Sequence, residues 1–220
     1  MRLTKLEFGA LLTYTPRGYS VKIQDAREFM IALKNERFVE DPQNGKLVLM
    51  SEWIAKTIQR NMTTLPFASF FQPNTILVPT PKTSLMRPDT LWVPERIASA
   101  ITKRGFGNKV ISCLTRNKSV PKAASSLAKD RPKSIDHYKS MSVTGILSKP
   151  DEIILVDDIV TRGATLLGAA NLLADAFPQT RIRAFAAIRT ISNPDEFDKL
   201  YDPCIGTIEL RESGDTLRRP

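Results

Sequence analysis

The feature that most constrains the fold is one stretch, EIILVDDIVTRGATLLGAA, at residues 152–170. Four apolar residues at 153–156 predict a buried β-strand, and they lead directly into two acids, Asp157 and Asp158. A glycine-containing turn follows, and then an Ala- and Leu-rich run that is typical of a helix. Strands that are apolar at nearly every position are typical of a parallel sheet that is covered on both faces.

The rest of the chain repeats this alternation of strands and helices. Strands are predicted at 75–81, 109–115, 152–156 and 181–189, with a short one at 205–210. Helices are predicted at 26–37, 51–62 and 164–177, with one more ending at Gly105 or Gly107. Residues 116–142 show no apolar period and predict a long mobile loop, which an ordered domain rarely keeps without a function. The pattern indicates an α/β fold.

The composition indicates an ordinary globular protein with one core. The 220 residues are 42% apolar and 25% charged, and we expect a single domain over 1–220. Within it, 1–72 would be an N-terminal helical part, 73–190 the core and 191–220 a C-terminal part. No run approaches the roughly 18 to 20 apolar residues of a membrane span, and no secretory signal is recognised. The distant Cys113 and Cys204 fit no zinc spacing, so we expect both reduced in the cytoplasm.

The quoted stretch has the chemistry of a sugar-phosphate site. In an open parallel sheet, ligands bind beyond the carboxyl ends of the strands, where Asp157 and Asp158 are expected. Paired carboxylates accept hydrogen bonds from vicinal hydroxyls, or hold Mg²⁺ through water. The turn from Thr161 to Thr165 enters a helix, whose free N–H groups and dipole favour an anion, and Gly163 permits close approach. A diol next to a phosphate describes a ribose 5-phosphate.

Three other readings of the stretch remain open. An acidic receiver pocket also follows an apolar strand, although such acids usually open a domain. A Walker B strand is similar, but the chain has no GxxxxGK[ST]. A plain strand-to-helix turn with solvated acids is the third reading.

The run IILVDDIVTRGAT resembles the ribose-phosphate signature of the type I phosphoribosyltransferases over thirteen contiguous positions. LVPTPKTS and the basic segment before the signature resemble the ComF-type competence-protein branch, although this chain has no zinc ribbon. Arg162 departs from the family pattern, since many members have a small residue or Thr there. The resemblance implies a central parallel sheet of about five strands with helices on both faces, and a variable hood from the N- and C-terminal segments.

The resemblance also implies ligands and residue roles. The ligand would be phosphoribosyl pyrophosphate with Mg²⁺, which Asp157 and Asp158 would hold through water. The residues implied to bind the sugar phosphate are Asp157, Asp158, Thr161, Arg162, Gly163, Ala164 and Thr165. The implied pyrophosphate loop is Thr80, Pro81, Lys82, Thr83 and Ser84, and the candidates in the basic segment are Arg116, Lys118, Lys122 and Arg131. Asp157, Asp158 and Lys82 would be catalytic, and His137 is more often a structural residue in such a place.

The function implied is transfer of the phosphoribosyl group to an unidentified nitrogen nucleophile, with release of pyrophosphate. A non-catalytic nucleotide-binding regulator and a ComF-like accessory factor in DNA metabolism are the alternatives. Residues 103–139 hold ten Lys or Arg against two Asp, which makes nucleic acid a second candidate partner for this segment. Polyphosphate is favoured, because no aromatic residues are interleaved as a stacking platform. No membrane partner is expected, and a homodimer is compatible with the sequence.

Overall fold

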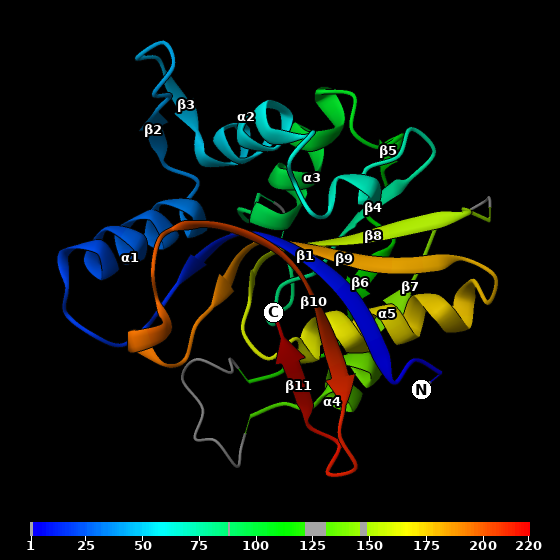
Figure 1. Cartoon of the computed structure of the whole chain (residues 1–220). Helices are drawn as coiled ribbons and strands as arrows, with labels where there is room; N and C mark the ends of the chain where they lie inside the picture. The colour runs from blue at the N-terminus through cyan, green and yellow to red at the C-terminus, as the bar shows by residue number, and fades with distance from the viewer. Residues whose placement is uncertain (1, 88, 122–130, 146–148) are drawn as a thin grey trace.

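The computed structural model describes residues 2–87, 89–121, 131–145 and 149–220 (Figure 1). Its strands are β1 (Lys5–Tyr14), β2 (Phe38–Glu40), β3 (Leu47–Leu49), β4 (Ile76–Pro79), β5 (Lys109–Val110), β6 (Leu114–Arg116), β7 (Met141–Val143), β8 (Glu152–Val160), β9 (Arg181–Thr190), β10 (Tyr201–Leu210) and β11 (Thr216–Arg219). Its helices are α1 (Val21–Lys34), α2 (Met50–Asn61), α3 (Val93–Lys103), α4 (Ser134–Lys139) and α5 (Ala164–Ala176), with 3-10 turns η1 (Ala68–Phe70) and η4 (Pro194–Glu196).

A seven-stranded sheet in the order β11-β10-β1-β9-β8-β4-β5 forms the centre of the described structure. Strands β1, β9, β8, β4 and β5 are parallel to their neighbours, whereas β10 and β11 are added antiparallel at one edge. Helices α2 and α3 cover one face and α5 covers the other (Figure 1). The predicted α/β class, with a parallel sheet and helices on both faces, is confirmed.

Strand β8 shows why its sequence is apolar at successive positions. Ile154 and Val156 belong to the core on the side of α2 and α3, whereas Ile153 and Leu155 belong to the core on the side of α5. Successive side chains of a strand point to opposite faces, and both faces are covered here. All four side chains are therefore fully buried.

Several expected elements differ from the structure. Strand β1 was missed, and it lies in the middle of the sheet between β9 and β10, so the N-terminal segment supplies core as well as hood. The strand expected at 109–115 is divided: β5 joins the central sheet, whereas β6 pairs with β7 in a separate two-stranded sheet. The expected loop 116–142 contains α4 and the start of β7. Both elements pack against α5, and this tertiary contact stabilises them although their own sequence has no apolar periodicity.

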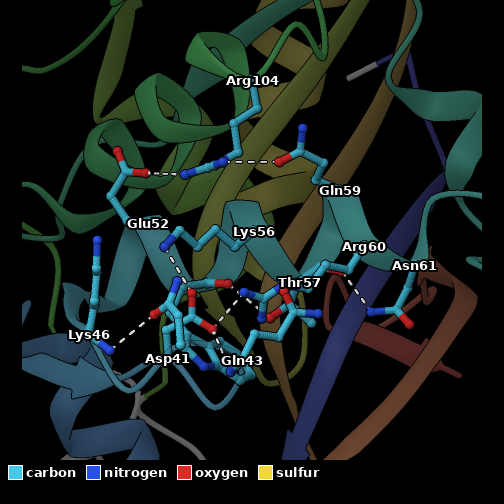
Figure 2. Close-up of polar contacts among 12 residues, drawn as sticks. Asp41, Gln43, Lys46, Glu52, Lys56, Thr57, Gln59, Arg60, Asn61 and Arg104 are labelled. Atoms are coloured by element: carbon cyan, nitrogen blue, oxygen red, sulfur yellow. Dashed lines mark hydrogen bonds and ion pairs between the residues drawn. The ribbon is translucent and has the colours of Figure 1, made fainter.

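A buried acid attaches the β2–β3 hairpin to the body of the protein. The carboxylate of Asp41 is fully buried and accepts hydrogen bonds from Lys56 at 2.9 Å and Arg60 at 2.5 Å, both on α2 (Figure 2). These hydrogen bonds hold the pKa of Asp41 well below its usual range. Figure 2 also shows Arg104, at the end of α3, donating to Glu52 of α2 at 2.9 Å. Polar contacts therefore join the hairpin and the two helices over one face of the sheet.

Candidate functional site

The two adjacent acids lie within a strand, and not beyond its end as the sequence predicted. Strand β8 continues to Val160, and β9 remains paired with it as far as that residue. On the other side, β4 ends at Pro79, opposite Val156. Asp157 and Asp158 therefore lie just beyond the carboxyl end of β4, at the edge where open parallel sheets bind ligands.

The acid pair is partly exposed, and its two carboxylates lie close enough to repel each other when charged. Oδ1 of Asp157 accepts the N–H of Asp158 at 3.0 Å, and Oδ1 of Asp158 accepts the N–H of Ile159 at 2.8 Å. Among the described residues, neither carboxylate forms an ion pair with a Lys, Arg or His side chain. Burial, and then the charge of Asp158, raise the pKa of Asp157 well above its usual range. Hydroxyl donors or a cation would relieve this repulsion.

The turn after the acids has the conformation that only glycine adopts easily. Gly163 precedes the first residue of α5 with φ of 83°, and no side chain caps the helix. A Cβ at this position would lie 2.5 Å from Ile208 of β10. The uncapped first turn leaves backbone N–H groups available to an anion.

A cavity of about 140 Å³ lies beside this turn. The residues that line it are Pro132, His137, Asp157, Ile159, Val160, Thr161, Arg162, Gly163, Ala164, Thr165 and Leu166. The structure therefore brings all five predicted residues of the turn to one cavity, together with Asp157. Asp158 is not among the residues that line it, although it follows Asp157 directly.

The predicted pyrophosphate loop begins next to the acid pair, directly after β4. The backbone N–H and the hydroxyl of Thr80 both donate to the carbonyl of Val156, at 2.9 and 3.2 Å, and Trp92 donates to the carbonyl of Thr80 at 2.7 Å. Thr80 is 1% exposed and Pro81 is buried. These two residues anchor the loop.

The outer part of the loop is accessible. Lys82 and Thr83 are partly exposed, and Ser84 is exposed. The side chains after Pro81 are therefore accessible to solvent.

Arg116 is not part of a mobile loop, as the sequence predicted, but the last residue of β6. It is 4% exposed, and its guanidinium donates from Nε to the carbonyl of Lys82 at 2.8 Å and from Nη1 to Ser140 at 2.5 Å. Burial lowers the pKa of Arg116 to about 10, while the nearby charge of Asp157 acts in the opposite direction. Arg116 is therefore a fixed cation between the loop and the acids.

The other basic residues predicted to contact the ligand are not placed between the loop and the acids as Arg116 is. Lys118 is exposed, and its backbone N–H donates to the carbonyl of Ser140 at 3.3 Å. Arg131 is partly exposed, next to Pro132 of the cavity wall. Lys122 lies outside the described residues.

The C-terminal hairpin, β10 and β11, was not expected at this site. Arg162 donates to Asp215 at 2.8 Å, so its side chain is directed to the hairpin. Arg218 donates to the carbonyls of Thr161, at 2.7 Å, and Thr190. The alternating residues 205–210 indicated a strand, but no sequence signal indicated where that strand would pack.

Comparison with known proteins supports a relationship for part of the chain. No protein-family model matches it. The chain is 33% identical over 86 residues to an orotate phosphoribosyltransferase of Lactobacillus johnsonii, a match covering 36% of this chain and 40% of the relative. The chain thus aligns with less than half of that relative's length. The similarity supports a superfamily of phosphoribosyltransferase type, whereas the ComF-type branch stays a prediction.

The described residues meet neither the requirements of a self-sufficient metal site nor those of a membrane-spanning helix. The described residues contain no group of three or more His, Cys, Asp or Glu that could hold a metal ion unaided. None of the helices in the described part of the chain has the length and apolar character needed to cross a membrane.

Proposed function

We propose that the chain binds phosphoribosyl pyrophosphate with Mg²⁺ and transfers the phosphoribosyl group to a nitrogen nucleophile, releasing pyrophosphate. One observation carries this proposal: Asp157 and the uncapped N-terminus of α5 line one cavity, and Asp158 follows Asp157 directly. The partial similarity to an orotate phosphoribosyltransferase supports the reaction class.

The turn before α5 would hold the 5-phosphate. The backbone N–H groups from Thr161 to Thr165 and the hydroxyls of both threonines are donors around the cavity. Arg162 contributes through its backbone, because its guanidinium is occupied by Asp215. The hydroxyls of the ribose would then donate to Asp157 and Asp158.

The loop after β4 would hold the pyrophosphate. Lys82, Thr83 and Ser84 supply an ammonium and two hydroxyls from its accessible part. Arg116 sets the position of this loop through the carbonyl of Lys82, and it adds a buried positive charge near the leaving group. A buried cation is effective against developing negative charge, because water does not screen it.

The acid pair fits Mg²⁺. Protein-bound Mg²⁺ is commonly held by one or two carboxylates, by waters and by substrate phosphates, so two carboxylates without a third ligand suffice. Asp157 and Asp158 would hold it through water, and the bound ion would neutralise charge on the pyrophosphate. The pKa of Asp157 is raised, and a bound cation would favour the charged carboxylate.

Displacement at C1 of the ribose places positive charge on the sugar ring and negative charge on the pyrophosphate. Asp157 and Asp158 would stabilise the ring, whereas Lys82 and Arg116 would stabilise the leaving group. The acceptor nitrogen supplies the electron pair for the new bond, so no covalent intermediate on the protein is needed.

The test is calorimetric binding of phosphoribosyl pyrophosphate with Mg²⁺ to the double variant Asp157→Asn, Asp158→Asn. We expect no measurable binding, with the far-ultraviolet circular dichroism spectrum retained. Asp151→Asn is the matched control, because Asp151 is an exposed acid just before the same strand. Unchanged affinity in the double variant would refute the site.

Turnover requires a separate assay. Release of pyrophosphate from the wild-type protein, measured over a panel of bases and amines, would identify the acceptor. Tight binding without release over the whole panel would instead support the non-catalytic regulator.

A further inference from the structure

A short helix is packed unusually closely against the start of α5. A Cβ at Gly168 of α5 would lie 2.6 Å from the carbonyl of Ser134 and 2.8 Å from Cβ of His137, both on α4. The absence of a side chain at Gly168 therefore lets α4 approach α5 one turn beyond the phosphate-binding turn. This approach brings His137 to the cavity wall.

His137 is buried at a place where a buried polar ring needs an explanation. It is 2% exposed and lines the cavity beside the turn. Nε2 lies 3.4 Å from Oγ1 of Thr165, and Nδ1 has no hydrogen-bond partner among the described residues. Buried polar atoms are nearly always paired, so the contact with Thr165 restricts which tautomer the ring adopts.

The surroundings of His137 keep its ring neutral. Burial lowers the pKa of His137 to about 4, and the charges of Arg116 and Arg162 act in the same direction, while Asp136 opposes them. A neutral imidazole has one N–H and one acceptor nitrogen. If Nδ1 carried the proton, a buried N–H would be left unpaired. With the proton on Nε2, that N–H reaches Thr165.

We propose that His137 is a positioning residue for phosphate recognition, which donates from Nε2 to Oγ1 of Thr165 and thereby directs the proton of that hydroxyl to an anion in the cavity. The ligand is a phosphomonoester, and the inference rests on the proposed function for the identity of that group as a ribose 5-phosphate. The hydroxyl of Thr165 has one proton to donate and two lone pairs that accept, so a hydrogen bond accepted from His137 leaves its proton for the ligand. His137 acts through Thr165 and exchanges no proton in the reaction.

The experiment is calorimetric binding of ribose 5-phosphate to the full chain and to variants at the two positions. We expect His137→Leu to weaken binding about tenfold, the value of one hydrogen bond to a charged group. We expect His137→Gln to restore most of the affinity, because its amide N–H lies about as far along the side chain as Nε2. His137→Asn has a shorter side chain and should behave as His137→Leu does.

A double-mutant cycle separates positioning from a structural effect. Thr165→Val should weaken binding, and adding His137→Leu to it should cause no further loss, because the two residues act as a unit. Independent, additive losses would overturn the proposal, and so would equal affinity of His137→Gln and His137→Asn. The comparison of Gln with Asn stays decisive even if His137→Leu fails to fold.

The failure of this inference is distinguishable from the failure of the proposed function. If the wild-type protein does not bind ribose 5-phosphate, both are wrong. If the wild-type protein binds and the double Asp157→Asn, Asp158→Asn variant does not, while His137→Leu binds normally, only the role of His137 is wrong.

Discussion

At the level of a single residue, Gly163 determines the geometry of the turn that we propose binds phosphate. Its φ of 83° lies in the region that other residues adopt at a cost, and Ile208 occupies the space that a side chain would need. The same residue precedes α5 and leaves its first N–H groups uncapped. One glycine therefore combines the tight turn, the contact with the C-terminal hairpin and the uncapped helix end.

We expect Gly163→Ala to lower the free energy of unfolding by about 2–4 kcal/mol, because backbone strain of about 1–2 kcal/mol adds to the clash with Ile208. Urea denaturation would measure this loss. Gly105→Ala is a matched control: Gly105 has φ of 82°, but a Cβ there would meet nothing within 4 Å. Equal losses in the two variants would show that Ile208 does not constrain the turn.

At the level of elements, the C-terminal hairpin acts as a second support for the turn before α5. Arg218 of β11 binds the carbonyl of Thr161 in the turn and the carbonyl of Thr190 at the end of β9. It is partly buried, whereas its neighbour Arg219 is exposed and lies 3.9 Å from Glu209. Of these two adjacent arginines, Arg218 therefore joins the hairpin to the turn, whereas Arg219 does not.

Replacing these two arginines separately tests this support. We expect Arg218→Gln to lower the free energy of unfolding by about 1–3 kcal/mol, since two backbone carbonyls lose a charged donor, and to weaken the binding of ribose 5-phosphate. Arg219→Gln, which removes the same charge from an exposed position, should change stability by less than about 0.5 kcal/mol. Chemical denaturation and calorimetry of both variants provide the comparison, and equal effects would contradict the role of Arg218.

At the level of the whole molecule, the N-terminal strand lies inside the sheet, among strands from the C-terminal part of the chain. Strand β1 lies between β9 and β10, so the N-terminal strand has a C-terminal strand on either side. In a cooperatively folded domain, titration of buried groups affects global stability. His137 and Asp157 are two such groups with opposite effects, because the pKa of the first is lowered and that of the second is raised.

His137, the only histidine in the sequence, makes the pH dependence testable. Between its unfolded pKa of about 6.5 and its folded pKa of about 4, the unfolded chain binds more protons. Its contribution to stability is therefore fully present above pH 6.5 and decreases as the pH falls to 4. Relative to His137→Gln, the wild-type protein should lose on the order of 3 kcal/mol of stability between pH 7 and pH 4. A difference that is independent of pH would show that His137 titrates normally.

Sequence reasoning located the candidate turn well, because that part of the site is local. Residues 161–165, which the sequence grouped as one candidate turn, line one cavity, since strand, turn and helix follow directly along the chain. Sequence reasoning was less successful for residues whose hydrogen-bond partners lie in distant segments of the chain. Arg116 was assigned to a mobile loop, yet it is buried in β6, because Lys82 and Ser140 provide acceptors that no local pattern reveals.

By itself, the sequence determined the α/β class, the apolar character of β8 and the glycine turn into α5, because each depends on residues within one short stretch. Only the tertiary structure decided that β1 lies in the middle of the sheet, that β4 ends before the acid pair, and that His137 and the C-terminal hairpin meet the turn. These features depend on pairing and packing between segments far apart in the chain. Local propensity and periodicity contain no information about which distant surface will cover a given residue.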